Sequence, residues 1–233
     1  MIASMPHTYV DLSHSIESGM SVAPRLPSPR VESYISHAAS RSAYGGQAEF
    51  EITRLFLVGN TGTSLDSPYH RFPGRVDVSA LRIEALVDLP GLRLDAARRT
   101  STRSGISIDL PDASIRGCAV LIRTGWDRRW GSEAYWAEGP WLGRTLAERL
   151  VEAGPALVGV DFANVDDRDD LSRPAHTVLL DANIPILENL RGLDQLPESG
   201  FRVFAPPLAV VGASAIPVRA FARVNVGRRT AEG

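Results

Sequence analysis

The chain contains no lysine: its 25 basic residues are all arginine, set against 27 acidic residues in a length of 233. A side-chain amine is required to form a Schiff base with a carbonyl substrate or with pyridoxal phosphate, and a P-loop requires a lysine for its phosphates. The absence of lysine excludes both kinds of chemistry. Arginine stays protonated at neutral pH, so no basic residue other than histidine is expected to act as a proton-transfer base.

Cysteine and histidine are also scarce. Cys118 is the single cysteine, so no internal disulfide can form, and we expect a cytoplasmic protein. Five histidines must supply any proton shuttle or any nitrogen ligand of a metal ion. They are His7, His14, His37, His70 and His176. No G-x-S-x-G or G-x-G-x-x-G motif follows an expected strand, which argues against a serine nucleophile elbow and a dinucleotide-binding turn.

The chain has little net charge and no long apolar run. A net charge of -2 provides no basic field for a phosphate backbone or an anionic membrane, so we expect no nucleic-acid partner and no membrane partner. The longest uncharged apolar run, residues 205–218, has 14 residues and three prolines, fewer than the roughly 20 residues that span a bilayer. The first residues, MIASMPHTYV, lack the basic and apolar regions of a signal peptide, and we expect none.

Most of the chain is divided into short apolar runs. With 44% hydrophobic residues it is long enough to bury a core, and we expect a single domain over residues 1–233 with a flexible tail at 228–233. Eight runs have the composition of strands. They cover residues 9–13, 50–58, 85–94, 119–124, 156–162, 184–190, 201–211 and 218–224. Several are continuously apolar, which indicates strands covered on both faces.

Two helices are indicated by their start and stop signals. One is expected over residues 140–153, because it begins at a proline, ends before a glycine and places three leucines on one face. A shorter helix carrying His176 is expected to begin at Pro174, since the proline moves Arg173 out of the helical region. The run DDRDD at 166–170 is expected to be an exposed loop. Many strands and few helices predict a mixed α/β domain with a sheet-dominated core.

The segment from Asn60 to Phe72 reads NTGTSLDSPYHRF and follows an expected strand. Loops at the edge of a sheet commonly carry binding and catalytic residues. Asp66 and His70 are four residues apart, so one helical turn, or a turn stiffened by Pro68, directs a carboxylate and an imidazole to one point. This spacing is used by pairs of metal ligands. The alternative is that Asp66 caps a turn and His70 is an ordinary hydrogen-bonded polar residue.

A second group of candidate residues lies in the stretch 173–190, RPAHTVLLDANIPILENL. His176 falls in the first turn of the expected helix, and Glu188 ends an apolar strand. A buried carboxylate is costly unless it is paired with a cation or hydrogen-bonded. Glu188 can therefore pair with one of the many arginines, or it can ligate a divalent cation together with histidines. Carboxylates combined with imidazoles suit zinc or manganese.

The chain resembles the cyclase family, the bacterial kynurenine formamidase-like metal-dependent hydrolases, whose signature reads H-x-G-T-H-x-D-x-P-x-H. The matching segment here reads N-T-G-T-S-L-D-S-P-Y-H, from Asn60 to His70, and is similar to a variant subgroup of the family. Further segments resemble the family in the same order: VDLSHSIESGM, VLIRTGWDRRW, VGVDFANVDD, RPAHTVLLDANIPILENL and PVRAFA. The resemblance covers nearly the whole chain and implies the family's fold, of the swivelling β/β/α type.

The resemblance also implies a set of metal ligands. By position in the motifs these are Asp66, His70, His176 and Glu188. Asn60 and Ser64 replace the first two histidines of the signature, and both are much weaker ligands for zinc because neither offers a basic nitrogen. We therefore expect at most one tightly held divalent ion, Zn²⁺ or Mn²⁺, where the full signature holds two.

The function that the resemblance implies is a metal-dependent hydrolase similar to arylformamidase. It would cleave an amide, formamide or lactam C–N bond of a small aromatic or cyclic substrate with a metal-activated water. Asp66 and His70 are the expected centre of catalysis. Asp161 or Asp166 is a candidate base and Arg71 a candidate for stabilising an oxyanion. The alternatives for Asp161 and Arg71 are a structural turn residue and a surface ion pair.

Two other functions remain open. The chain could be a metal-independent cyclase or dehydratase of a biosynthetic intermediate, in which Asp66, His70 and Glu188 transfer protons. It could also be a non-catalytic relative that binds a small molecule. In each case the substrate or ligand is expected to contact Asn60, Ser64, Trp126 and Asn164.

Aromatic residues are concentrated in one segment. Five of them lie within sixteen residues: Trp126, Trp130, Tyr135, Trp136 and Trp141. Large rings of this kind line pockets for planar substrates, form contacts between subunits, or pack in the core. The family resemblance implies a homodimer or homotetramer.

Overall fold

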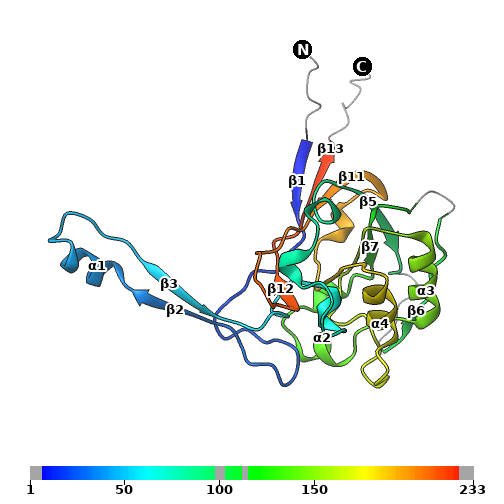
Figure 1. Cartoon of the computed structure of the whole chain (residues 1–233), viewed down its shortest axis with the longest axis horizontal. Coiled ribbons are helices and arrows are strands. Elements are labelled where there is room, and N and C mark those ends of the chain that lie inside the picture. Colours follow the sequence, from blue (N-terminus) through cyan, green and yellow to red (C-terminus); the bar gives the residue numbers. More distant parts are fainter. Residues whose placement is uncertain (1–6, 98–102, 112–114, 226–233) are drawn as a thin grey trace, which may run out of the picture.

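We analysed a computed structural model of the chain, which describes residues 7–97, 103–111 and 115–225. The expected tail at 228–233 lies outside the described residues. Figure 1 shows a body built around one large sheet and a long arm that extends away from it, while β1 and β13 run side by side at one edge. Within the described residues no helix is long and apolar enough to cross a membrane.

The body is organised by a nine-stranded sheet with the order β1-β13-β11-β5-β7-β9-β10-β4-β12. In chain order these strands are β1 (His7–Asp11), β4 (Ser64–Asp66), β5 (Leu89–Asp95), β7 (Ala119–Arg123), β9 (Leu157–Val160), β10 (Ile186–Glu188), β11 (Ser199–Phe204), β12 (Ala215–Pro217) and β13 (Phe221–Asn225). The four central strands β5, β7, β9 and β10 are parallel. The flanking pairs are antiparallel. The expectation of a mixed α/β fold dominated by a sheet is confirmed.

The central strands are buried on both faces, which explains their continuous apolar sequences. Successive side chains on β7 and β9 point to opposite faces of the sheet and pack in two different hydrophobic clusters. Val120 and Val158 belong to the first cluster, and Leu121 and Leu157 belong to the second. The first cluster includes the buried faces of α2 (Glu133–Ala137), α3 (Arg144–Ala153) and α4 (Pro174–Asp181). The second includes residues from short 3₁₀ turns and from β11 and β13.

Short elements complete the body. The 3₁₀ helices are η1 (Pro68–His70), η2 (Val78–Ala80), η3 (Ile83–Ala85), η4 (Trp126–Arg129) and η5 (Leu193–Gln195). A small second sheet pairs β6 (Gly105–Ile106) with β8 (Trp141–Leu142). Together with the helices, these turns and strands connect the strands of the main sheet.

Three expected boundaries are corrected by the structure. The helix expected from residue 140 begins at Arg144, because Trp141 and Leu142 pair with β6 instead. The strand expected over 201–211 ends at Phe204, since two prolines follow and cannot donate ladder hydrogen bonds. The strand expected over 218–224 is observed as Phe221–Asn225. The helix expected from Pro174 is confirmed, and Arg173 before it has the left-handed backbone conformation φ 52°.

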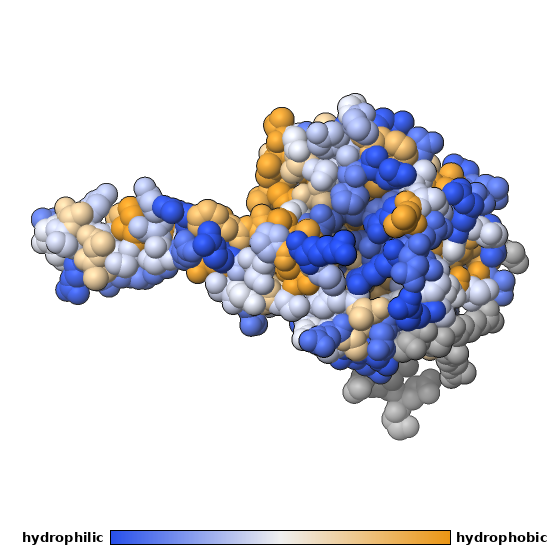
Figure 2. All heavy atoms as spheres, turned by 90° about the horizontal axis from the view of Figure 1, so that it is seen from below, coloured by the Kyte–Doolittle hydropathy of each residue, from blue (hydrophilic) through white to orange (hydrophobic). Residues whose placement is uncertain are grey.

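The arm consists of residues 30–56. It contains β2 (Arg30–Ile35), α1 (His37–Ala43) and β3 (Ile52–Phe56), and within the described part of the chain the two strands pair only with each other. The strand expected over 50–58 is therefore present, but it lies outside the main sheet. Figures 1 and 2 show the arm projecting from the body, with hydrophobic residues on its surface. The chain returns from the arm directly to Asn60, where the signature segment begins.

Candidate active site

The pairing of β4 with β10 brings two acidic side chains together. The two strands are antiparallel, and Ser64 lies opposite Glu188. Opposite residues share one face of a sheet, and residues two apart on a strand share it as well. Ser64, Asp66 and Glu188 therefore project from the same face, and all three are buried. This register joins the signature segment to the end of the IPILENL strand.

His176 lies between these two carboxylates. It is in the first turn of α4, and its Nε2 atom is 3.4 Å from Asp66 Oδ2 and 3.6 Å from Glu188 Oε1. On the other side of the ring, His176 Nδ1 is 2.6 Å from Asp166 Oδ2. The imidazole is 2% exposed, and both of its nitrogens face protein carboxylates, while Arg173 Nη2 also lies 3.3 Å from Nδ1.

His70 completes the group from the opposite side. The 3₁₀ turn η1 begins at Pro68 and ends at His70, so the signature segment bends immediately after β4. The rings of His70 and His176 are 5.5 Å apart between centroids. One ligand atom each from Asp66, His70 and His176 lies within 4.8 Å of the others. The expected approach of Asp66 and His70 is thus observed, and these residues form a possible metal site.

Burial and charge shift the pKa of each member of this group. Burial acts to raise the pKa of Asp66, but the nearby imidazoles of His176 and His70 and the hydrogen bond from Asn60 hold it below its usual range. Burial and the charge of Asp66 raise the pKa of Glu188 to about 7. Burial opposes the charge on His176, yet the hydrogen bond to Asp166 and the nearby carboxylates of Asp66 and Glu188 raise its pKa to about 9. Burial lowers the pKa of His70, which leaves this ring neutral at pH 7.

The donor set fits a divalent cation. Asp66 Oδ2 is buried and has no hydrogen-bond partner, although it faces His176 Nε2. A buried carboxylate oxygen without a partner is costly, and a cation bound between Asp66, His176 and Glu188 would remove that cost. Two carboxylates and two imidazoles are also the ligand types that zinc and manganese accept. Within the described residues Glu188 makes its ion pair with His176, not with an arginine.

The other carboxylate oxygen of Asp66, Oδ1, is hydrogen-bonded to Asn60. Its side-chain amide donates a 3.1 Å hydrogen bond to Asp66 Oδ1. An N–H donor satisfies that oxygen in the way a cation otherwise would, which leaves Oδ2 as the open ligand atom. Ser64, on the same strand face as Asp66, has a buried hydroxyl without a hydrogen-bond partner. Both expected substrate-binding residues of the signature segment therefore lie beside Asp66.

The remaining expected site residues hydrogen-bond to residues outside this group. Asp161 accepts four hydrogen bonds, all from Thr124 and Gly125, and burial raises its pKa to about 7. Trp126 is buried and donates its indole N–H to the carbonyl of Tyr135 at 3.2 Å. Arg71 is exposed and donates a 2.9 Å hydrogen bond to Thr177 Oγ1 on α4.

Asp166 corrects the expectation that the run at 166–170 is exposed. Its side chain is fully buried, whereas Arg168 to Asp170 are exposed. It accepts backbone hydrogen bonds from Ala175 and His176 at the start of α4, in addition to the ring of His176. A signal for this role exists in the sequence: Arg173 cannot cap the helix that begins at Pro174, so its first N–H groups need an acceptor from elsewhere.

The aromatic segment contacts His14 and Asn189, which both hydrogen-bond to the signature segment. Trp130 stacks on His14, with ring centroids 3.9 Å apart, and contacts Tyr135 and Trp136. The hydroxyl of Tyr135 donates a 2.8 Å hydrogen bond to Asn189, the residue after Glu188. Burial lowers the pKa of His14 to about 4, so this ring is neutral at pH 7. No local pattern around His14 in the sequence indicates this contact.

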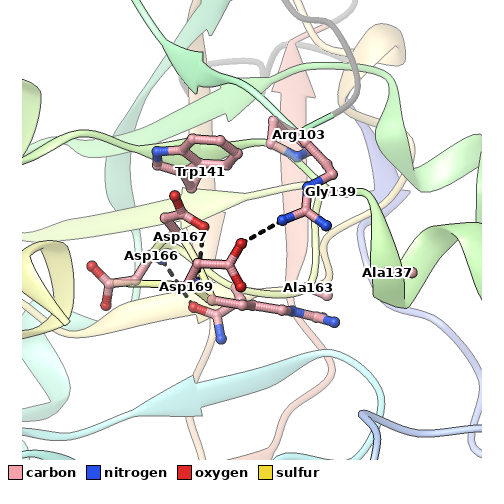
Figure 3. Close-up of a pocket in the computed structure, with 11 residues that line it drawn as sticks. Arg103, Ala137, Gly139, Trp141, Ala163, Asp166, Asp167 and Asp169 are labelled. Carbon is pink, nitrogen blue, oxygen red and sulfur yellow. Dashed lines mark hydrogen bonds and ion pairs between the residues drawn. The ribbon is translucent and has the colours of Figure 1, made fainter. Parts of the chain in front are cut away.

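A small cavity of about 90 Å³ adjoins Asp166. Figure 3 shows its lining, in which Asp166, Asp167 and Asp169 lie below Trp141 and Asp169 forms an ion pair with Arg103. Asn164, an expected substrate-binding residue, also lines this cavity and accepts a 2.9 Å hydrogen bond from the backbone N–H of Asp166. Asp166 therefore contacts His176 of the buried acidic and histidine group and also lines this cavity.

Comparison with known proteins identifies relatives of the whole fold. The family model described as "Putative cyclase" matches residues 10–167. A kynurenine formamidase from Salinibacter ruber is 45% identical over 178 residues, which cover 76% of this chain and 82% of that protein. One from Paracidovorax citrulli is 31% identical over 189 residues, covering 77% and 82%.

Among solved structures, isatin hydrolase A from Ralstonia solanacearum superimposes with a TM-score of 0.78 at 26% identity. The superposition covers 94% of this chain and 92% of that protein. The match to the family model spans more than half of the chain, and the relatives are similar over about three quarters of it. The chain belongs to the cyclase family.

Proposed function

We propose that the chain is a hydrolase that cleaves an amide, formamide or lactam C–N bond of a small aromatic or cyclic substrate with the help of one divalent metal ion. The observation that carries the proposal is the group formed by Asp66, His70 and His176, with the open Oδ2 atom of Asp66 at its centre. Its relatives support the reaction class, because they include kynurenine formamidases and an isatin hydrolase.

Asp66, His70 and His176, together with Glu188 beside His176, would hold the ion, which would supply Lewis acidity by lowering the pKa of a water molecule and polarising the carbonyl. His70 is the most accessible member of the group and carries a neutral ring at pH 7. A neutral imidazole can complete the ligand set or accept a proton from the attacking water. Ser64 offers a free hydroxyl that could bind the substrate next to Asp66.

We propose one ion, Zn²⁺ or Mn²⁺, instead of two. The support is the hydrogen bond from Asn60 to Asp66 Oδ1, since this amide stands where a second ion would need that oxygen. Asn60 and Ser64 would then contact substrate instead of metal. The carboxylate of Asp161 is satisfied by four hydrogen bonds to Thr124 and Gly125. This supports a structural role for Asp161 over that of a general base.

The test is metal analysis combined with an activity screen. Protein purified without a polyhistidine tag is expected to contain, or to take up, about one equivalent of Zn²⁺ or Mn²⁺ per chain. The loaded protein is expected to hydrolyse aryl formamides or isatin-type lactams, followed by ultraviolet absorbance and chromatography. Chelation should remove the activity and add-back of metal should restore it. Turnover that persists without metal would contradict this proposal.

A metal-independent cyclase or dehydratase is the second candidate. Burial and Asp66 raise the pKa of Glu188 to about 7, which places a proton donor or acceptor in the same buried group. The same screen separates the two functions. Conversion of a substrate by metal-free protein, without net addition of water, would favour this candidate.

We also propose that the protein is a homodimer or homotetramer in which the arm of one chain covers another. Six large hydrophobic side chains of the arm are 40–61% exposed, and they are Val31, Tyr34, Tyr44, Ile52, Leu55 and Phe56. A two-stranded hairpin is marginally stable in water by itself, and apolar surfaces of this extent are usual at subunit contacts. The charges of the arm balance, which favours a partner of low net charge such as a second copy.

Replacement of Leu55 by arginine is expected to convert the oligomer to a monomer at micromolar concentration. Leu55 is 61% exposed near the base of the arm, opposite Val31, so the substitution adds a charge to a contact without disturbing the core. Sedimentation velocity measures the result. Replacement of Gln47 by arginine, at an exposed polar position of the arm, is the control and should leave the oligomer intact. A parent protein that sediments as a monomer would contradict the proposal.

A further inference from the structure

The contacts of His176 differ on its two sides. Nδ1 is 2.6 Å from a single carboxylate, that of Asp166, while Nε2 faces Asp66 and Glu188 at 3.4 and 3.6 Å. A neutral imidazole carries one proton, and the nitrogen without it is the one that can bind a metal ion. Whichever group fixes the proton on Nδ1 therefore decides whether Nε2 can act as a ligand.

Asp166 is held in place more tightly than its exposed neighbours. One of its oxygens accepts the backbone N–H of Ala175 at 2.5 Å, and the other accepts the backbone N–H and the ring of His176. The guanidinium of Arg173 lies 3.4 Å from the same carboxylate. All of these neighbours are donors, so they favour an ionised carboxylate, which accepts hydrogen bonds on both oxygens.

The backbone around Arg173 shows that this arrangement is held against local preference. Arg173 has φ 52° and ψ 58°, in the left-handed region that non-glycine residues rarely adopt. This conformation places Pro174 at the first position of α4 and lets the guanidinium of Arg173 reach Asp166. Strained residues persist where the surrounding contacts determine them, and here these contacts converge on Asp166 and His176.

We propose that Asp166 is a positioning residue that keeps the ring proton of His176 on Nδ1 and so presents the Nε2 lone pair to the metal ion; the metal part of this inference rests on the proposed function. Carboxylates that hold the distal nitrogen of a ligating histidine typically contribute 10–100-fold to metal affinity. This assignment replaces the alternative in which Asp166 is a general base, because its side chain contacts only donors, from Arg173, Ala175 and His176, among the described residues.

Asparagine at position 166 tests the inference, since it has the same size as aspartate but one end of its amide is a donor. If the NH₂ group faces Ala175, two N–H groups oppose each other. If it faces His176, it donates to Nδ1 and forces the proton onto Nε2, where the metal ion should bind. Asp166→Asn is therefore expected to weaken Zn²⁺ binding by about 10–100-fold in a chelator competition assay.

Nuclear magnetic resonance of the ¹⁵N-labelled imidazoles gives the second measurement. The parent protein is expected to show a hydrogen-bonded Nδ1–H resonance of His176 with and without Zn²⁺, assigned by its loss in His176→Gln. Asp166→Asn should lose this resonance, because the side-chain amide would donate to Nδ1 instead of accepting its proton. Asp167→Asn is the matched control, because Asp167 is adjacent but accepts its hydrogen bond from Asp169, and it should resemble the parent.

The two measurements separate failure of this inference from failure of the proposed function. If the parent protein shows the Nδ1–H resonance but binds no Zn²⁺, and Asp166→Asn lacks that resonance, the positioning role stands and the metal-dependent function is rejected. If Asp166→Asn keeps both the Nδ1–H resonance and the Zn²⁺ affinity of the parent, the inference is overturned.

Discussion

Replacement of His176 by alanine is expected to lower the metal content from about one equivalent to almost none, and to remove hydrolysis together with it. His176 is the residue that links the two acidic strands, since its Nε2 atom faces both Asp66 and Glu188. Loss of a direct ligand should exceed the 10–100-fold effect typical of outer-sphere partners. Elemental analysis and a Zn²⁺ competition assay measure the loss.

The same substitution should destabilise the metal-free protein. Without the imidazole, Asp66 and Glu188 are two buried carboxylates that face each other without a cation, and removing one member of a buried ion pair typically costs about 3–5 kcal/mol. Urea denaturation measures this cost. His37→Ala is the control for loss of a histidine, because His37 lies exposed on the arm, where it pairs with Glu51. Full metal content in His176→Ala would place the ion elsewhere.

Zn²⁺ affinity is expected to rise steeply with pH, which is the second large effect. In the metal-free protein the pKa of His176 is about 9 and that of Glu188 is about 7. A metal ion binds the deprotonated forms, so it must displace any proton that these groups carry. Between pH 7 and 9 one proton is displaced, from His176, and the affinity should rise about tenfold per pH unit.

Below pH 7 Glu188 is protonated as well, and the slope should approach two protons per ion. Competition titrations at pH 6, 7 and 8 measure the slope, and calorimetry in buffers of different ionisation enthalpy counts the protons released. His176→Gln lacks one of the titrating groups, so its weaker binding should have a slope lower by one proton. An affinity that is constant from pH 6 to 8 would show that neither group binds the ion.

Local sequence patterns indicated Asp66, His70 and Glu188 as candidate residues, but they did not indicate which other side chains these residues contact. The spacing of Asp66 and His70 around Pro68 indicated their approach, and the structure places them in one group. Glu188 was identified as an unusual carboxylate because it ends an apolar strand, and it is buried beside His176. These signals are carried by neighbouring residues, and such signals can be read without knowing the fold.

The role of Asp166 shows where local reading fails. Four of the five residues in its run are acidic, which is typical of an exposed loop, and Arg168 to Asp170 are exposed. Asp166 alone turns inward, because the first N–H groups of α4 and the ring of His176 need an acceptor. That need arises only when the loop is folded against the helix.

By itself the sequence determined the class of the protein: the absence of lysine, the few histidines and the apolar strands limited both the chemistry and the architecture. The tertiary structure decided the pairing of β4 with β10, which places Ser64 opposite Glu188, and the course of residues 30–56 as an arm, where the sequence predicted only a strand over 50–58. The reason is physical. Propensity and periodicity depend on neighbours along the chain, whereas register and partner choice depend on contacts between separate segments, which for β4 and β10 lie more than a hundred residues apart.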